Sequence, residues 1–479
     1  MDTRQEQLYK ALLAKMQNEP TPCQDRFFRQ VSDFVLSDAD VMVLNGYAGT
    51  GKTTAIACLV AALKSLKIKS VLLAPTGRAA KVLSLYAGAK AYTVHKHIYR
   101  QKTVGSDGFG QFTLSPNKDR NTLFVVDEVS LMGNEETSAQ STASFGTGHL
   151  LDDLLTFVRN GVNCKVLLVG DSAQLPPVGL DESPALSREY MNILSDDVSF
   201  CELTTVVRQK DESGILYNAT LLRNIIDSEP YDIDYESLGL EISPFSDIER
   251  ISGGELIEKI SDAYSRYGED ETVILCRSNR RANRYNAGIR SMVQYKEERL
   301  VKDDKLMIVK NCYQFVEDIP DLDYIANGDI ALLVKISKYE ERYGLHFAQA
   351  RLRFPDYDDQ EIEAKVILDT LESESASLTH EQSNALYLGV NQDYSHITSK
   401  KKRYDAVRED KYFNALQLKY AGAITCHKAQ GGQWDCVFID NPFWQDNLTV
   451  DDLKWLYTAI TRAKTKVYLV NFKDEMFCM

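Results

Sequence analysis

The chain has 479 residues, of which 44% are hydrophobic and 26% are charged, and its formal net charge at pH 7 is −14. A chain of this length exceeds one hydrophobic core, so we expect roughly two to four domains, and the acidic balance argues against a protein that coats nucleic acid non-specifically. No apolar run approaches the roughly 18 residues that span a bilayer, and the first residues show no signal-peptide pattern, which predicts a cytoplasmic protein with no membrane partner.

Apolar runs in the first half of the chain predict strands that are buried on both faces of a parallel sheet. Each run ends in small, polar or acidic residues and is followed by a stretch with helical periodicity, which is typical of an α/β domain. Functional side chains are expected where such strands end. The runs lie at 41–45, 70–76, 122–128 and 165–171.

The first of these strands leads into GYAGTGKTT at 46–54, which fits the pattern G-x-x-x-x-G-K-[ST] between a strand and a helix. Its glycines let backbone N–H groups surround a phosphate chain, and the helix N-terminus adds its positive dipole end. The motif predicts that Lys52 binds the β- and γ-phosphates and that Thr53 holds Mg²⁺. The nucleotide-binding residues of this loop are Gly46, Ala48, Gly49, Thr50, Gly51, Lys52, Thr53 and Thr54.

The strand at 122–128 ends in two neighbouring acids. A carboxylate at the end of a buried strand is costly unless it faces a cation, so Asp127 is a candidate Mg²⁺ partner. Glu128 is placed to orient and deprotonate an attacking water, which favours ATP hydrolysis over phosphoryl transfer to a small molecule. After the next strand, Gln174 is either a sensor of the γ-phosphate or a loop amide that the backbone satisfies.

Apolar runs return at 272–279, 436–440 and 466–472 and predict a second α/β domain. Between them, 330–415 alternates like antiparallel strands and predicts a small β-rich insertion, with an acidic stretch at 356–375. A shorter insertion at about 98–121 has glycines between two β-like runs, which predicts a hairpin. The basic runs at 277–290 and 399–403 are most simply solvated faces.

The nine cysteines form no C-x-x-C pair, and their odd number argues against a disulfide framework or a zinc site. The stretch 422–440 nevertheless places Cys426, His427 and Cys436 close together, so a metal or thiol site has to be weighed there.

A set of motifs carries a resemblance over about 24–470. In chain order they are GYAGTGKTT, APTGRAAKVL, YTVHKHI, VVDEVSLM, GDSAQLPPVG, LTTVVRQ, ITCHKAQGGQWDCVFI and LYTAITRAK. Together they resemble the superfamily 1B helicases of the RecD-like and Dda-like kind. The resemblance implies an α/β fold with two RecA-like P-loop motor domains on parallel sheets, a β-hairpin insertion (1B) and a small SH3-like β insertion (2B).

The expected domain bounds follow from the positions of these motifs. Motor domain 1A is expected at 1–230, with hairpin 1B at about 98–121. Motor domain 2A is expected at 231–330 and 416–479, and insertion 2B at 331–415.

The resemblance also assigns roles at the ATP site. Gln24 looks like the family's adenine-reading glutamine, Gly431 like the glycine near the γ-phosphate, and Arg208 and Arg462 like two arginine fingers. The implied catalytic set is Lys52, Asp127, Glu128, Gln174, Arg208 and Arg462. Tyr457 and Thr458 fall in the motif of Arg462 and receive no role.

Single-strand contacts are implied from both motor domains, by hydroxyl, imidazole and backbone groups that suit phosphates irrespective of sequence. They are Pro75, Thr76, Thr93 and His95 in the first domain and Thr425, His427 and Lys428 in the second. For His95 a core histidine is the alternative. Phe109 or Phe112 of the hairpin would wedge against the last base pair, unless they pack the hairpin base.

The motifs predict an ATP- and Mg²⁺-dependent motor, and the resemblance implies a helicase that moves 5′ to 3′ on single-stranded DNA and unwinds forked DNA in replication, recombination or repair. The alternatives are a single-strand translocase, the motor subunit of a recombination or nuclease complex, and a plain nucleotide-binding switch. One chain holds both sides of the ATP cleft, which predicts a monomer that also meets recombination or replication proteins. In this interpretation Cys426 and Cys436 are packing residues, and 425–431 touches both the DNA and the γ-phosphate.

Overall fold

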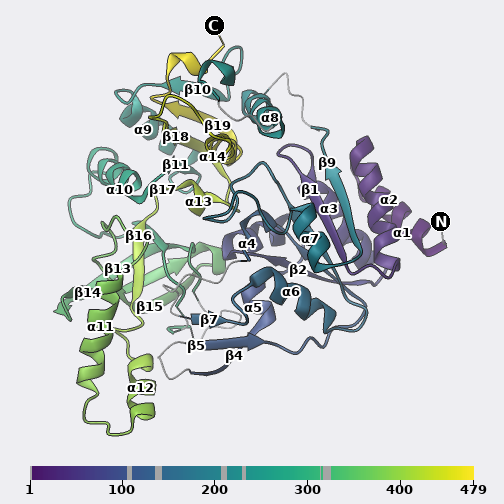
Figure 1. The fold of residues 1–479 in the computed structure, drawn as a ribbon. Helices are drawn as coiled ribbons and strands as arrows, with labels where there is room; N and C mark the ends of the chain where they lie inside the picture. Colours follow the sequence, from purple (N-terminus) through teal and green to yellow (C-terminus); the bar gives the residue numbers. More distant parts are fainter. Residues whose placement is uncertain are drawn as a thin grey trace.

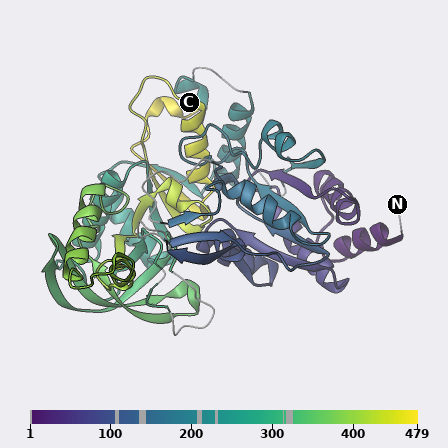
Figure 2. The ribbon, with the colours of Figure 1, turned by 60° about the horizontal axis from the view of Figure 1, so that its bottom comes forward.

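The protein contains two open parallel sheets and a closed barrel. The structure is a computed structural model, and it describes residues 3–104, 110–134, 143–206, 213–228, 233–312, 314–316 and 325–478. The first sheet and the barrel lie towards opposite ends of the molecule, and the chain passes from the first sheet through the second into the barrel and back (Figure 1). A turned view shows the barrel and its two helices on the left and the first sheet on the right (Figure 2). The expected fold class is thereby confirmed.

The first sheet has six strands, all parallel. In spatial order they are β3 (Ala91–Thr93), β2 (Lys69–Ala74), β6 (Thr122–Val126), β8 (Lys165–Gly170), β1 (Val41–Gly46) and β9 (Val198–Leu203). The central strands β6 and β8 are buried along their whole length because helices cover both faces of the sheet.

Two hydrophobic cores sandwich this sheet. One face packs against α1 (Thr3–Leu13), α2 (Pro22–Leu36), α3 (Lys52–Ser65) and α4 (Gly77–Ala87). The other face packs against α5 (Val94–Ile98), α6 (Leu150–Arg159) and α7 (Arg188–Leu194). The helices that follow β1, β2 and β3 therefore begin at one edge of the sheet, where the strands end.

The predicted hairpin is present. Strand β4 (Tyr99–Val104) pairs antiparallel with β5 (Gly110–Leu114), and β7 (Ala143–Phe145) joins β5 in parallel. Its tip, including Phe109, lies outside the described residues.

The second sheet has five parallel strands. In spatial order they are β10 (Ile248–Ile251), β19 (Ala463–Val470), β18 (Trp434–Asp440), β11 (Thr272–Cys276) and β17 (Ala423–Thr425). One face packs against α8 (Gly214–Asp227) and α14 (Val450–Ile460), and the other against α9 (Leu256–Tyr267) and α10 (Asn279–Gly288). The short helix α13 (Cys426–Ala429) follows β17 directly.

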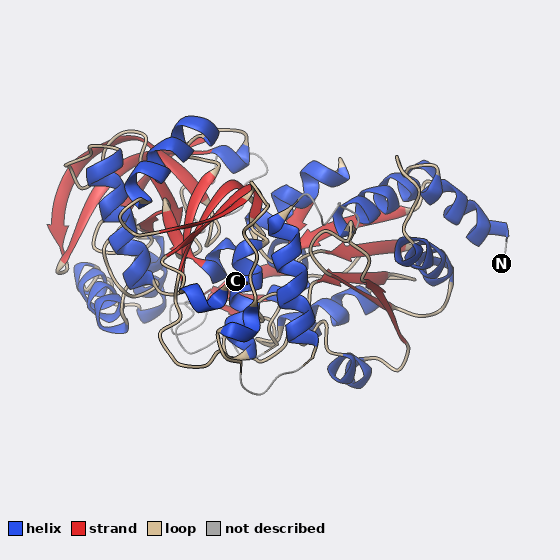
Figure 3. Ribbon diagram, turned by 90° about the horizontal axis from the view of Figure 1, so that it is seen from above, coloured by secondary structure: helices blue, strands red, loops and turns tan. Residues whose placement is uncertain are grey.

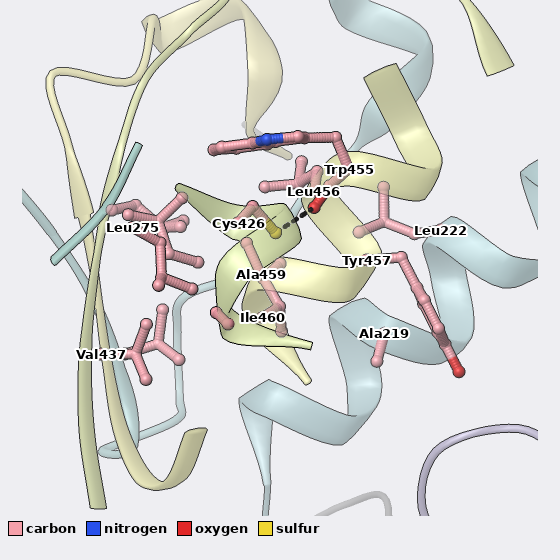
Figure 4. Close-up of a cluster of buried hydrophobic side chains, with 14 of the residues drawn as sticks. Ala219, Leu222, Leu275, Cys426, Val437, Trp455, Leu456, Tyr457, Ala459 and Ile460 are labelled. Carbon is pink, nitrogen blue, oxygen red and sulfur yellow. Dashed lines mark hydrogen bonds between the residues drawn. The ribbon is translucent and has the colours of Figure 1, made fainter. Parts of the chain in front are cut away.

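The cysteines of the 422–440 stretch are packing residues in this sheet. Cys426 lies among Leu275, Ala459 and other apolar side chains, and its thiol donates to the Trp455 carbonyl oxygen over 3.7 Å (Figure 4). Cys436 is fully buried in the core on the opposite face. Within the described ranges no group of three or more His, Cys, Asp or Glu could hold a metal ion, so the metal alternative fails there.

The barrel closes through five strands: β12 (Lys305–Ile308), β13 (Ile330–Arg342), β14 (Leu345–Phe354), β15 (Gln360–Ile367) and β16 (Leu416–Tyr420). It therefore draws its first and last strands from outside the expected 331–415. The part of that range after β15 is helical instead of β-rich, because α11 (His380–Asp393) and α12 (Lys400–Glu409) form a projecting pair (Figure 1). Coloured by secondary structure, the molecule shows helices beside the long barrel strands at the left (Figure 3). A capping box at Thr379 with Gln382 starts α11, a helix signal that the β interpretation overlooked.

The expected domain bounds stay a prediction. Helix α8 lies before residue 230, the expected end of the first motor domain. Its buried side chains nevertheless pack in the core of the second sheet. None of the helices in the described part of the chain has the length and apolarity needed to cross a membrane.

A buried ion cluster fixes the join between the barrel and the second sheet, and it yields a stability prediction. Asp304 is 2% exposed and accepts from Arg290 and from Lys296 Nζ, the latter at 3.0 Å. Asp304→Asn should lower the free energy of unfolding by about 3–5 kcal/mol, because two cations lose their counter-charge in a buried site. Urea unfolding of the purified protein measures this, with the exposed neighbour Asp303→Asn as the control. Equal losses in both variants would contradict it.

Candidate nucleotide site and nucleic-acid groove

The loop between β1 and α3 has the backbone of a phosphate-binding loop. Gly49 and Gly51 adopt left-handed φ values of 76° and 81°, which favour glycine. At Gly46 a Cβ atom would lie 2.7 Å from Lys52 Cγ, so only glycine lets the lysine fold back over the loop. Gly51 caps α3 without a side-chain hydrogen bond. The amides of the first turn of α3 therefore face the position of an anion.

Lys52 is held across this loop by the protein itself. Its ammonium donates to the Gly46 carbonyl oxygen and lies 3.4 Å from Asp171 Oδ2. Asp171 follows β8 and is 1% exposed. The sequence interpretation missed this residue, although an acid directly after a buried strand was the signal that identified Asp127.

Asp127 and Glu128 lie side by side after β6. Burial raises the pKa of Asp127, and hydrogen bonds from the Tyr86 hydroxyl and the Glu128 N–H partly offset that rise. Burial also raises the pKa of Glu128, opposed mainly by the charge of Arg462. In the described ranges no Lys, Arg or His forms an ion pair with either carboxylate, so the pair is chemically suited to a divalent cation.

Glu128 also has a backbone feature that marks functional sites. Its φ is 56°, in the left-handed region that residues other than glycine rarely adopt. Such strain persists only when the surroundings enforce it, and it gathers at active sites.

The second sheet contributes directly to this site through α14. The Tyr457 hydroxyl donates to Asp171 Oδ2 and accepts from the Ala48 N–H, both over 2.8 Å. The Thr458 hydroxyl accepts from the Leu175 N–H over 2.8 Å. The two residues that received no role from the sequence thus join the sheets at the phosphate loop and at the loop after β8.

Gln430 completes that junction, because its amide donates to the Leu175 carbonyl oxygen over 2.7 Å. The neighbouring Gln174 is 5% exposed, and its side-chain oxygen has no hydrogen-bond partner in the described structure. An unpartnered buried acceptor indicates that the backbone does not satisfy this amide fully, which favours the sensor interpretation over the loop-amide alternative.

Four further ATP-site candidates are Gln24, Arg462, Gly431 and Arg208. Gln24 donates to the Thr50 carbonyl oxygen over 3.2 Å, which ties the adenine candidate to the phosphate loop. Arg462 is 3% exposed and donates only to neutral oxygens, such as the carbonyl of Gly432. Gly431 has a φ of 75°, and a Cβ there would lie 2.8 Å from the Ala79 side chain of α4. Arg208 lies outside the described residues.

A basic groove of about 480 Å³ opens beside α13. Three of its lining residues, Thr425, His427 and Lys428, are predicted strand contacts. The groove adds cations that the sequence interpretation missed: Arg277, Arg280 and Lys419. The signal was the basic run at 277–290, which had been assigned to a solvated face.

Lys428 and His427 sit in this groove with altered proton affinities. Burial lowers the pKa of Lys428 to about 8, and its ammonium lies 2.5 Å from Asn327 Oδ1. Burial and the charge of Arg277 lower the pKa of His427.

The residues of the first motor domain that are predicted to contact single-stranded DNA lie at the starts of helices or pack against other side chains. Thr76 and Thr93 cap α4 and α5 through their hydroxyls. The His95 ring packs edge-on against Phe145 at 5.1 Å, and burial lowers its pKa to about 4. Phe112 stacks on the same Phe145 at 4.5 Å. Pro75 is partly exposed just before α4. The strand-binding roles of these residues stay predictions.

Family models match both sheets. One described as an AAA domain matches residues 24–225, and one described as a UvrD-like helicase C-terminal domain matches residues 420–470. The first match includes the phosphate loop, and the second includes α13 and α14.

Two curated relatives and a solved structure resemble parts of the chain. An ATP-dependent RecD2 DNA helicase of Deinococcus radiodurans is 35% identical over 181 residues, which is 37% of this chain and 21% of the relative. The ATP-dependent DNA helicase dda of Enterobacteria phage T4 is 29% identical over 186 residues, 38% of each chain. The chain thus spans well under half the length of either relative. The crystal structure of Pif1 helicase from Bacteroides in complex with ADP-AlF3 and ssDNA has a TM-score of 0.47 at 16% identity, over 96% of this chain and 94% of that one.

The half-buried carboxylates of Asp127 and Glu128 should lower the stability of the folded protein. A raised pKa in the folded state means that the contribution of Glu128 to stability is full below its ordinary pKa, near 4.5, and is lost as pH rises through the raised value. Without nucleotide, Glu128→Gln should therefore raise the free energy of unfolding at pH 8 by about 1–3 kcal/mol. Urea unfolding across pH measures the effect, and the gain should vanish towards pH 4.5.

The matched control is Glu189→Gln on the exposed face of α7, which should leave the free energy of unfolding unchanged at every pH. A Glu128→Gln variant that is less stable than the native protein at pH 8 would contradict the assignment.

Proposed function

We propose that this chain, which belongs to the superfamily 1B helicases of the RecD-like and Dda-like kind, is an ATP-dependent helicase that moves 5′ to 3′ along single-stranded DNA and separates the duplex ahead of it. One observation carries the proposal. Within seven residues, 425–431 lines the basic groove with Thr425 and Lys428 and reaches the loop after β8 with Gln430. A short rigid segment thus joins a surface suited to phosphates with the edge of a nucleotide site.

The proposed ATP site is built from charged and polar groups of the chain itself. The phosphates of ATP would accept from the amides of the first turn of α3 and from Lys52, which now bridges Gly46 and Asp171. Thr53 and Asp127 would hold Mg²⁺, which when bound neutralises charge on the β- and γ-oxygens. Glu128 would orient the attacking water and accept its proton. Gln174 and Arg462 would contact the transferred phosphoryl group, the arginine to offset its developing charge.

Stepping follows from where these groups originate. Lys52, Asp127 and Glu128 belong to the first sheet, whereas Tyr457 and Arg462 belong to the second. Each nucleotide state would therefore set how the two sheets join, and the strand contacts on each sheet would tighten in turn. The proposed partners are single-stranded and forked DNA, and the proposed working unit is a monomer acting in replication, recombination or repair.

A single-strand translocase that unwinds poorly is the second candidate. The stacking of Phe112 on Phe145 favours it, because this contact holds one of the two predicted wedge residues against the neighbouring strand β7. Phe109→Ala tests the remaining wedge, and unwinding per ATP at the native rate in this variant would rule out Phe109 as the wedge.

The decisive experiment compares forked duplexes with a single 5′ or 3′ tail. Unwinding should require ATP and a 5′ tail, and single-stranded DNA should stimulate hydrolysis. Lys52→Ala and Glu128→Gln should each reduce turnover by about 100-fold or more, but Glu128→Gln should keep its affinity for ATP. Lys64→Ala, on the exposed face of the same helix, is the control and should be unaffected.

Three results would count against the proposal. Unwinding from a 3′ tail would reverse the polarity. Hydrolysis that single-stranded DNA does not stimulate would favour the nucleotide switch. Equal loss of ATP binding in both variants would remove Glu128 from the role of hydrolytic base.

The groove gives a separate prediction about salt. If Lys428 contacts a phosphate, Lys428→Gln should make the plot of log affinity against log salt concentration shallower by about 0.7 for a single strand. Anisotropy titrations of a labelled oligodeoxythymidine measure this slope. Lys401→Gln, an exposed lysine of α12 outside the groove, should leave the slope unchanged. Parallel shifts in both variants would show that only net charge matters.

A further inference from the structure

The acidic stretch that follows β15 crosses the mouth of the basic groove. We call residues 372–376 the strap. Two strap residues, Glu374 and Ala376, line the same cavity as Thr425, His427 and Lys428. The strap therefore lies where a strand bound in the groove would pass.

The strap presents acceptors to the groove's donors. Glu374 lies 3.3 Å from Arg280 Nε, and Glu372 lies 4.0 Å from Arg299 Nε. The Ser373 carbonyl oxygen accepts from the ammonium of Lys419. Carboxylate and carbonyl oxygens of the strap thus contact Arg and Lys side chains, which are the kind of cation that binds the phosphates of a nucleic acid.

A neutral donor reinforces this arrangement. The side-chain amide of Asn283, on α10, donates to the carbonyl oxygens of Glu372 and Ser373, each over 2.9 Å. The strap backbone is thereby held along the basic face of α10, as a bound strand would be.

The contacts of the strap are replaceable because no side chain within it is buried. The side chains of Glu372 and Glu374 are both 69% exposed. The anchors lie outside it, at Leu371 in the barrel core and at Leu378 against the helical pair. The strap is therefore a tethered segment whose ends are fixed. Its two glutamates are held by exposed charges, which bind weakly, and its backbone accepts from Asn283 and Lys419.

The same insertion partners two other cations near the predicted strand contacts. Asn327 accepts from Lys428 over 2.5 Å, and Asp356 lies 2.7 Å from the ammonium of Lys81 on α4. Lys81 belongs to the motif APTGRAAKVL, which also contains the predicted strand contacts Pro75 and Thr76. The barrel thus supplies oxygen atoms to cations from both motor sheets.

We propose that the strap is an autoinhibitory substitute for the phosphate backbone, which occupies the groove in the free protein and leaves it when a single strand binds. This inference rests on the proposed function of the groove. It gives two acids of the stretch a physical role. Glu374 competes with DNA for Arg280 of the groove, whereas Glu372 pairs with Arg299 beside it and helps to keep the strap in place. Binding is thereby restricted to strands that offer enough phosphates to displace the strap.

The test compares two double variants that each remove two negative charges from the same insertion. Glu372→Gln with Glu374→Gln releases the strap. Glu361→Gln with Glu363→Gln is the matched control, because these exposed residues of β15 face Arg351 at 4.0 and 2.5 Å, away from the groove. Both variants should fold, since all four side chains are exposed.

The strap variant should bind a labelled oligodeoxythymidine about threefold or more tightly than the native protein, and the control should stay near the native affinity. Equal gains in affinity in the two variants would contradict the proposed role of the strap, but not the proposed binding of a single strand in the groove. A native protein that fails to bind the oligonucleotide would overturn the proposed function as well.

Amide hydrogen exchange supplies a second measurement on the native protein. Adding the oligonucleotide should speed exchange in 372–376 by several-fold and leave β15 unchanged. Slower exchange in the strap on binding would mean that it closes over the strand, which would contradict displacement.

Discussion

The hydroxyl of Tyr457 lies between the Ala48 N–H and the Asp171 carboxylate, and the geometry of the site depends on this buried junction. It joins a helix of the second sheet to two strand ends of the first, and Asp171 in turn holds the ammonium of Lys52. In a low-dielectric interior such a chain of hydrogen bonds is strong when complete and costly when broken. An anion that draws Lys52 away from Asp171 therefore changes the balance of charge at a contact between the two sheets.

The charge that a bound phosphate would meet on this protein differs locally from the net charge of the chain. The net charge of −14 would disfavour a polyanion over long range, yet Arg277, Arg280 and Lys419 collect beside α13. Acidic segments of the barrel lie against such cations and screen them. Net charge thus sets solubility and the long-range field, whereas the arrangement of a few side chains sets which surface can receive a phosphate.

Much of the fold could be predicted from the sequence because its strongest signals are local. An apolar strand before a glycine-rich turn locates Lys52, and an acid at the end of another buried strand locates Asp127. Both are confirmed at one edge of the first sheet, because parallel strands end on the same side. The hairpin of β4 and β5 was equally accessible, since its glycines separate two short alternating runs.

What could not be predicted depends on contacts between distant segments. Nothing local distinguishes the basic run around Arg280 from a solvated face until Lys419 and Lys428 are seen beside it. Glu374 is likewise one acid among many until its distance to Arg280 is known. The Thr379 capping box could have predicted the start of the helical pair, but the alternating pattern before it led to a β prediction for the whole range up to residue 415. Phe109 and Arg208 stay predictions, because they lie outside the described residues.

The raised pKa values of Asp127 and Glu128 also bear on how long the protein survives in a cell. Two neighbouring acids that burial disfavours in their charged form lower the stability of the protein without ligand, and proteases act on the unfolded fraction. Any ligand that binds only the folded form shifts that balance, by about 2.7 kcal/mol at a hundredfold excess over its dissociation constant. Under the proposed function, starvation for nucleotide would shorten the lifetime of the protein, so that its abundance would follow the energy supply of the cell.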